Sequence, residues 1–145
     1  MICGDGIRRF SLGLALLGAA LLFGIPADTA RAQDAPDCAE QATQADMNTC
    51  ADLDYEEADA ELNTEYQKAR KALGDWDKAA DDTSRGAVAA LVAAQRAWVS
   101  YRDANCEASG FQARGGSMEP MLVSSCLADM SRKRADELRQ LSEGF

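Results

Sequence analysis

A group of four acidic residues in the first half of the sequence is the first candidate for metal binding or catalysis. Asp52, Asp54, Glu56 and Glu57 stand close together. Spaced carboxylates are found in calcium loops, and pairs of carboxylates hydrolyse glycosides. A calcium loop needs a glycine at its sharp turn, which is missing here. Carboxylates on one exposed helix face also lack a cleft that would raise a pKa. We therefore interpret the segment as a solvated acidic face.

The absence of histidine narrows the chemistry further. The 145 residues include no histidine, which excludes Ser-His-Asp and Cys-His nucleophiles and every histidine-containing metal site. We expect no catalytic residue, no cofactor and no metal, and hence no enzyme. The formal net charge of −9 repels phosphate backbones and anionic lipids. A basic protein is therefore a better partner than nucleic acid or a membrane surface.

The first 32 residues predict a cleaved signal peptide. Arg8 and Arg9 precede an uncharged apolar run over 10–25, and Ala30-Arg31-Ala32 supplies the small residues that a signal peptidase reads. The run is shorter than the roughly 20 residues of a bilayer span, so a transmembrane anchor is the weaker alternative. We expect cleavage after Ala32 and no membrane anchor afterwards. The mature domain, residues 33–145, would be periplasmic or secreted.

Four cysteines remain after the predicted cleavage: Cys38, Cys50, Cys106 and Cys126. An even number of cysteines in an exported chain predicts two disulfides. The alternative, a zinc site made by four thiolates, lacks any closely spaced cysteine pair. Cleavage also removes three arginines and two aspartates, which changes the formal net charge to −10. The segment from Asp34 to Glu65 then holds 11 acidic residues and no basic one.

Hydrophobic periodicity predicts a long first helix. Thr43 can cap its start, with Asp46 three residues later, and Gly74 is expected to end it. Between these points, apolar residues recur every three or four positions, as on one face of an α-helix: Met47, Ala51, Tyr55, Ala58, Leu62, Tyr66, Ala69 and Leu73. A polar connection over 75–84 follows. Its Trp76 either folds back on the core or is an exposed loop aromatic.

Two further helices are predicted. An alanine-rich helix begins near Ser84 and runs to about Ala108, stopping at Gly110. Its bulkier residues, which cover one broad side of the helix, are Val88, Leu91, Val92, Trp98, Val99 and Tyr101. After a loop over 110–117, Ser117 can cap a third helix with Pro120 in its first turn. That helix carries Val123, Leu127, Met130, Leu138 and Leu141 at helical spacing and ends at Gly144.

These elements predict an all-α fold, an antiparallel three-helix arrangement with two disulfides. No strand pattern is present. The topology brings all four cysteines to one end of the helices. Because Cys50 and Cys126 lie at matching depths in the first and third helices, we predict the pairs Cys50–Cys126 and Cys38–Cys106. The other two pairings remain possible, because sequence alone does not settle connectivity.

Several polar residues lie on or beside the apolar faces: Asp59, Asn63, Gln95, Arg102 and Arg134. A buried charge is costly unless it is paired. We therefore predict an internal network, with Asp59 bound to Arg102 or Arg134, that fixes the register of the helices. A ligand site for a carboxylate is the alternative.

Three segments resemble the LprI-type lysozyme-inhibitor domain family. The first contains Met47-Asn48, Cys50, Ala58-Asp59, Leu62-Asn63 and Tyr66. The second contains Gln95-Arg96-Ala97-Trp98, Tyr101-Arg102-Asp103 and Cys106, and the third Gly115-Gly116-Ser117, Cys126-Leu127, Arg134 and Leu138. The resemblance spans about 38–141 and implies an exported, disulfide-bonded helical domain that inhibits lysozyme. The sequence departs from lipid-anchored forms because it lacks a lipidation cysteine.

The resemblance gives the loop over 110–117 a possible role. A lysozyme cleft holds two catalytic carboxylates. Arg114, with Gln112 and Ser117, could enter such a cleft, and Gly115 and Gly116 shape the turn. The acidic first helix would steer the protein toward a basic enzyme. The alternatives are a plain turn for the loop and, for the protein, a cell-envelope interaction module with no muramidase target. The oligomeric state stays open.

Overall fold

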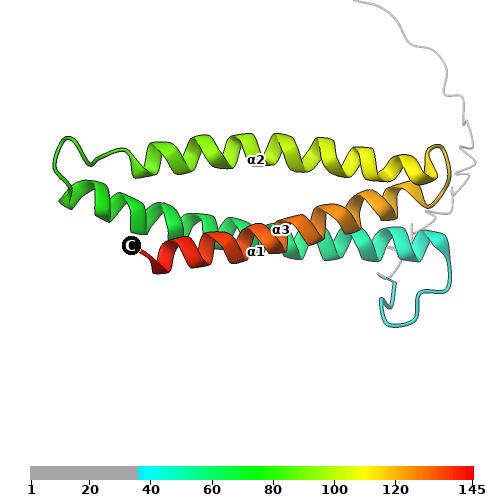
Figure 1. The fold of residues 1–145 in the computed structure, drawn as a ribbon. Coiled ribbons are helices and arrows are strands. Elements are labelled where there is room, and N and C mark those ends of the chain that lie inside the picture. Colours follow the sequence, from blue (N-terminus) through cyan, green and yellow to red (C-terminus); the bar gives the residue numbers. More distant parts are fainter. Residues whose placement is uncertain (1–35) are drawn as a thin grey trace, which may run out of the picture. The chain divides into compact units, whose positions relative to one another are not determined.

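Three α-helices make up most of residues 36–145, the part of the chain that the computed structural model describes (Figure 1). Helix α1 spans Gln44–Ala79, α2 spans Ala87–Gly110 and α3 spans Glu119–Glu143, with a short 3-10 helix, η1, at Phe111–Ala113. Consecutive helices run antiparallel, and residues 36–145 contain no strand. The predicted all-α antiparallel fold is therefore confirmed. The predicted signal peptide and the cleavage point after Ala32 lie outside the described residues.

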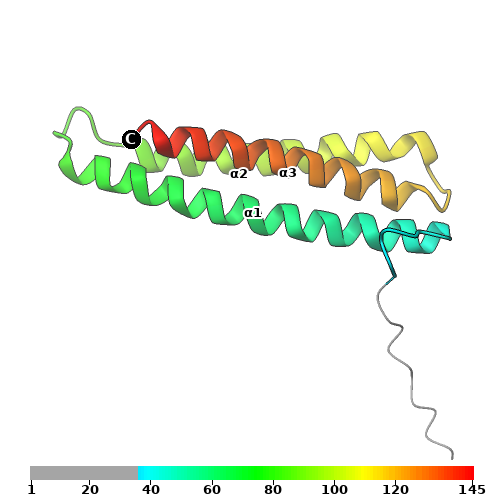
Figure 2. The same cartoon turned by 90° about the horizontal axis from the view of Figure 1, so that it is seen from below.

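The three helices pack unevenly. Helices α1 and α3 are in contact along most of their length, and α3 crosses α1 obliquely in Figure 1. Helix α2 contacts both less extensively, and Figure 2 shows it beside α3. The main apolar cluster lies in the half away from the cysteines and contains Leu62, Ala69, Leu73, Leu91, Ala135 and Leu138. No helix among the described residues is both long and apolar enough to span a membrane.

The start of α1 follows the prediction, whereas its end does not. The Thr43 hydroxyl accepts the Asp46 N–H, and the Asp46 carboxylate accepts the Thr43 N–H, which confirms the capping box. The expected stop at Gly74 is wrong, because α1 continues to Ala79. The extra turn is stabilised by Asp75, which binds Lys71 at 2.7 Å and Lys78 at 2.8 Å. A glycine inside a helix costs only about 1 kcal/mol relative to alanine, which such contacts can offset.

The start of α2 depends on a residue of the preceding helix. Ser84 is not the cap, and α2 begins at Ala87. The Asp77 carboxylate instead accepts the backbone N–H groups of Gly86 and Ala87 at 3.0 Å and of Val88 at 3.1 Å. These bonds satisfy N–H groups that have no partner within the helix. They also lower the pKa of Asp77, the Val88 N–H having the largest effect. Asp77 therefore ties the end of α1 to the start of α2.

Helix α3 meets the other helices through small side chains. Its buried residues are Ser124, Ala128, Ser131, Ala135 and Leu138. The predicted apolar stripe borders this buried face: Leu138 is buried, Val123, Leu127 and Met130 are partly buried, and Leu141 is exposed. The expected cap at Ser117 is wrong, because the helix starts at Glu119 without a side-chain cap. Pro120 in the first turn and Gly144 at the end are confirmed.

Candidate functional site

The candidate site lies where the start of α1, the end of α2 and the start of α3 meet, which we call the cystine end (Figure 1). All four cysteines of the described residues lie there, in two disulfides. Cys38 is bonded to Cys50, and Cys106 is bonded to Cys126. The predicted pairs Cys50–Cys126 and Cys38–Cys106 are therefore wrong. The zinc alternative fails as well, because none of these sulfurs is a free thiolate.

The wrong pairing has a simple structural cause. The segment before α1 turns back along the first two turns of that helix, so Cys38 reaches Cys50, 12 residues away. The short connection between α2 and α3 holds Cys106 beside Cys126, 20 residues away. Each disulfide therefore joins two cysteines that follow one another in the sequence. Matching depth in α1 and α3 therefore did not identify the partner of Cys126.

The connection between α2 and α3, residues 111–118, is held close to both helices; we call it the 111–118 loop. A Cβ atom at Gly110 would lie 2.6 Å from Val123 Cγ2, so glycine allows α2 to end directly against α3. Gly115 has φ +77°, a conformation that favours glycine. The Gly116 N–H donates to the Ala113 carbonyl at 2.8 Å. These glycines make the loop compact.

Arg114 is bound within the loop. Its guanidinium donates to Glu119 Oε1 at 2.9 Å and lies 4.4 Å from the centre of the Phe111 ring. The other oxygen of Glu119 accepts the Gly115 N–H at 2.7 Å. The Gly115 N–H, aided by Arg114, lowers the pKa of Glu119. Glu119 therefore binds two consecutive residues of the loop, Arg114 and Gly115, while the Arg114 side chain stays 55% exposed.

The remaining predicted loop residues differ in their contacts. Ser117 contributes its carbonyl, which accepts the Asn48 side-chain amide at 3.0 Å and links the loop to α1. Gln112 is exposed. Phe111 and Met118, which sequence reasoning missed as surface residues, are 56% and 44% exposed at the two ends of the loop. The loop thus presents two apolar side chains around Arg114 and Gln112.

The acidic segment of α1 is only partly free. Asp52 accepts a hydrogen bond from the Ser124 hydroxyl, and Asp54 binds Arg132 of α3. The Arg132 hydrogen bond lowers the pKa of Asp54. Glu56 and Glu57 are exposed. No group of three or more Cys, Asp or Glu side chains within residues 36–145 is arranged to hold a metal ion.

Arg102, itself buried, is the centre of a polar cluster between the helices. It binds Asp59 at 3.1 Å, Asp103 at 2.9 Å and the Ser131 hydroxyl at 3.3 Å. Asn63 donates to the second oxygen of Asp59 at 2.8 Å. The guanidinium also lies 5.5 Å from the centre of the Tyr55 ring and 5.2 Å from that of Trp98. Of the two expected partners of Asp59, the structure therefore selects Arg102.

The other two predicted network residues form a separate pair. Arg134 Nε donates to Gln95 Oε1 at 3.1 Å, and its guanidinium binds Glu137 at 2.7 Å. Arg134 also lies 6.0 Å from the Trp98 ring centre. Both arginines are therefore near the Trp98 ring, and the predicted set is divided into two clusters that share this side chain.

Glu65 is a buried acidic residue that sequence reasoning missed. It is 5% exposed and binds Lys68 at 2.8 Å, while its second oxygen has no hydrogen-bond partner among the described residues. Its position three residues after Leu62 and four before Ala69 places it on the apolar face of α1. That spacing could have revealed it. Ser131 could have been found by the same spacing between Ala128 and Ala135.

Comparisons with known proteins agree on the class of domain. Residues 36–138 match the family described as lysozyme inhibitor LprI. An uncharacterized protein of Rhizobium meliloti (strain 1021) is 54% identical over 114 residues, covering 77% of this chain and 82% of that protein. A DUF1311-family protein of Pseudomonas putida KT2440, known from its crystal structure, superposes with a TM-score of 0.61. The alignment covers 72% of this chain and 98% of that protein at 24% identity. This likeness shows the fold alone.

Proposed function

The chain belongs to the lysozyme inhibitor LprI family, and from that premise we propose that it is an exported inhibitor that blocks the cleft of a lysozyme-type muramidase. The family match over 36–138 is the observation that carries the proposal. The two disulfides support an oxidising compartment, the periplasm or the outside of the cell. The protein acts by binding and catalyses no reaction itself.

The 111–118 loop is the part that we assign to the contact with the enzyme. Tight interfaces are centred on aromatic and arginine side chains that bury in the partner. Phe111 and Arg114 are of this kind, Met118 adds apolar area, and Gln112 adds an amide beside them. The Cys106–Cys126 bridge, the Gly115–Gly116 turn and the Ser117 carbonyl hold the loop in place, which lowers the entropy lost on binding.

Arg114 can bind a partner although it already forms an ion pair with Glu119, because a cleft with carboxylates can take the place of Glu119. In the free protein its positive charge is shared with Glu119, which keeps the side chain beside the Phe111 ring. A cleft that holds two carboxylates offers the guanidinium a second set of acceptors of the same kind. Glu56 and Glu57, exposed on α1, favour approach to a basic enzyme and raise the rate of association at low salt.

A lysis assay tests the proposal. Lysozyme-type muramidases clear a suspension of peptidoglycan, and the oxidised protein should slow this clearing in proportion to its concentration. Arg114→Ala and Phe111→Ala should each weaken inhibition about tenfold or more, as for central interface residues.

Lys133→Ala provides a matched control for the loss of one positive charge. Lys133 is exposed on α3 and forms no ion pair with another described residue. Its removal should leave inhibition unchanged within about twofold. Full inhibition by Arg114→Ala would overturn the loop assignment. A well-folded protein without effect on any muramidase tested would instead favour the cell-envelope interaction module.

A further inference from the structure

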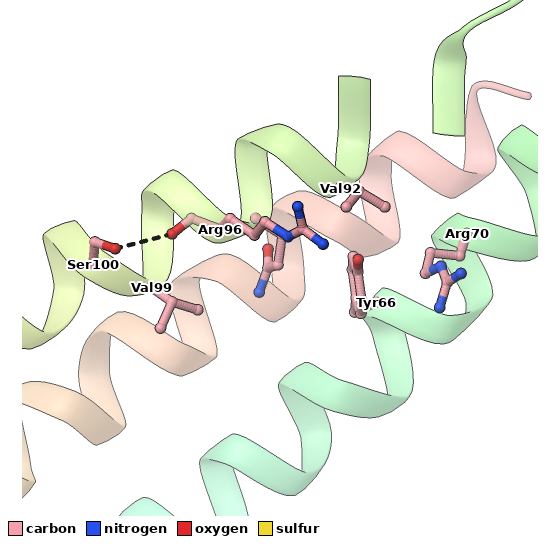
Figure 3. A pocket seen from close by; sticks show the side chains of 7 residues that line it. Tyr66, Arg70, Val92, Arg96, Val99 and Ser100 are labelled. Atoms are coloured by element: carbon pink, nitrogen blue, oxygen red, sulfur yellow. Dashed lines mark hydrogen bonds between the residues drawn. The ribbon is translucent and has the colours of Figure 1, made fainter. Parts of the chain in front are cut away.

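A pocket of about 540 Å³ lies between α1 and α2, midway along the two helices (Figure 3). Its lining residues are Tyr66 and Arg70 of α1 and Val92, Gln95, Arg96, Val99 and Ser100 of α2. The volume falls within the range of about 300–1,000 Å³ that is usual for small-ligand sites. None of these residues belongs to the 111–118 loop, so the pocket is separate from the surface assigned above.

The pocket carries two arginines in a protein whose formal net charge is −9. Neither Arg70 nor Arg96 has an acidic residue three or four positions away on its helix. Neither forms an ion pair with another described residue. In Figure 3 their guanidinium groups lie on either side of the Tyr66 ring, and Arg70 is 5.7 Å from the centre of that ring. The two positive charges are therefore available to a ligand.

Gln95 adds a third donor, and its orientation is fixed. The side chain is about nine-tenths buried, and its Oε1 accepts the hydrogen bond from Arg134 Nε. Arg134 is in turn held by Glu137 and lies over the Trp98 ring. Since the oxygen is already engaged, the NH₂ group of Gln95 is the part left to donate, and the residue lines the pocket. Gln95 is thus an unpartnered donor that Arg134 positions.

The other lining groups complete a site for an anion with an apolar body. The Ser100 hydroxyl is already used, donating to the Arg96 carbonyl at 3.2 Å. Val92 and Val99 supply the apolar wall opposite Tyr66 (Figure 3). No carboxylate lines the pocket. The lining therefore combines two guanidinium groups and an amide donor with two aliphatic side chains.

We propose that this pocket binds the free carboxyl terminus of a peptide whose last residue is apolar. The terminal carboxylate is held by Arg70 and Arg96, because guanidinium groups match the two oxygens of a carboxylate. The Gln95 amide donates to the preceding peptide carbonyl, and the last side chain lies on Val92 and Val99. The open side of the pocket lets the rest of the peptide leave toward solvent.

A peptide end fits the lining better than a fatty acid does. A peptide carbonyl gives the Gln95 NH₂ an acceptor of its own while the arginines hold the carboxylate, and an alkyl chain does not. An alkyl chain in an open pocket would also remain partly in water, which reduces the gain from burial. The proposal does not rest on muramidase inhibition.

The direct test is nuclear magnetic resonance of the oxidised protein labelled with ¹⁵N and ¹³C. The probe is N-acetyl-alanyl-leucine, and the control ligand is the same dipeptide with an amide at its carboxyl end. The free acid should shift the signals of the Gln95 side-chain amide and of the Val92 and Val99 methyl groups. The amide should bind at least tenfold more weakly, because it lacks the charge that the arginines recognise. Octanoate tests the fatty-acid alternative.

Variants connect the binding to the arginines. Arg70→Gln and Arg96→Gln should each weaken binding of the free acid about tenfold, and Lys133→Gln, which removes one charge elsewhere, should change it less than twofold. Both pocket arginines are exposed, so melting temperatures should match the parent. Equal binding of acid and amide, an equal loss in Lys133→Gln, shifts that avoid the pocket, or binding of octanoate alone would each overturn the proposal.

Discussion

The two ends of the helical unit are held together by different kinds of interaction. At the cystine end, two disulfides join the segment before α1 to α1 and join α2 to α3. The other end, which we call the open end, has no cysteine and is held by noncovalent contacts, which include the apolar cluster in that half of the helices. There Asp77 binds the first N–H groups of α2, and the Trp76 ring meets the Phe145 ring edge-on at 5.5 Å. One end is thus fixed covalently and the other by noncovalent contacts alone.

This difference indicates where the protein is rigid and where it can open. Local opening requires the fewest broken contacts where helices end without covalent links. Trp76 is 48% exposed although it lies on α1, so neither expectation for it, a core aromatic or a loop aromatic, describes it fully. The 111–118 loop lies at the rigid end, which suits a surface that must keep one shape to bind tightly.

The largest expected effect comes from the cluster between the two ends. Arg102→Ala should lower the free energy of unfolding by roughly 3–4 kcal/mol, because it leaves Asp59 without its cation. The value lies low in the usual range for buried pairs since the carboxylates are partly exposed. Urea denaturation measures the change, with Lys133→Ala as control. A midpoint equal to that of the parent would refute the structural role of Arg102.

Removing a disulfide should have a slightly smaller effect on stability. The double replacement Cys106→Ser with Cys126→Ser should cost about 3 kcal/mol by the loss of a 20-residue loop closure. Cys38→Ser with Cys50→Ser should cost nearly as much. Denaturation and the lysis assay together separate the two bridges. Only the first pair should also weaken inhibition, because it anchors the 111–118 loop; equal inhibition by both would contradict that view.

Asp77→Ala should weaken the open end selectively. The backbone N–H groups of Gly86, Ala87 and Val88 would lose their acceptor. We expect a fall in Tm of about 4–8 °C, the size typical of a lost helix cap. Hydrogen exchange should speed up in the first turn of α2 and stay unchanged near Cys106. Faster exchange at both ends would mean that the two ends do not open independently.

Acid should destabilise the open end before the cystine end, and this is the smallest of the expected effects because it is absent near neutral pH. Hydrogen bonds from Lys71 and Lys78 hold the pKa of Asp75 at about 2, and the pKa values of Asp77 and Asp81 are also lowered. A carboxylate with a lowered pKa stabilises the fold above its unfolded value of about 3.9, and this contribution is lost as pH falls through the folded pKa.

Hydrogen exchange between pH 5 and pH 2 measures this loss. Protection at the start of α2 should decline before protection near Cys126, although Asp54 and Glu119 at the cystine end also have lowered pKa values. Asp77→Asn removes one titrating group and should flatten the decline at α2. A simultaneous decline at both ends would remove the distinction between them.

The fold could be predicted from the sequence because the local signals agree. The capping box at Thr43, the spacing of apolar residues in α1 and the glycine after α3 each indicate a helix or its boundary, and the structure confirms them. The errors arise where side-chain contacts override the preference of a single residue. Gly74 remains inside α1, and α2 starts at the residues that Asp77 binds instead of at Ser84.

The candidate site was less accessible to sequence reasoning. The contacts of each candidate residue depend on how the helices lie beside one another, which the sequence does not show. Arg114 was expected to enter a partner's cleft, and the structure pairs it with Glu119, five residues later across a tight turn. The close approach of α2 to α3 at Gly110 and Val123 depends on a single glycine, which produces no periodic pattern in the sequence.

The small side chains of α3 have a consequence for how this protein can vary. Ala128, Ser131 and Ala135 are fully buried, so the backbones of α3 and its neighbours form much of the interior. Added methyl groups at these positions force side chains off their rotamers or shift the helix backbones. Substitution at Ala128 and Ala135 should therefore be limited by bulk, whereas Ser131 must also keep the hydroxyl that accepts a hydrogen bond from Arg102.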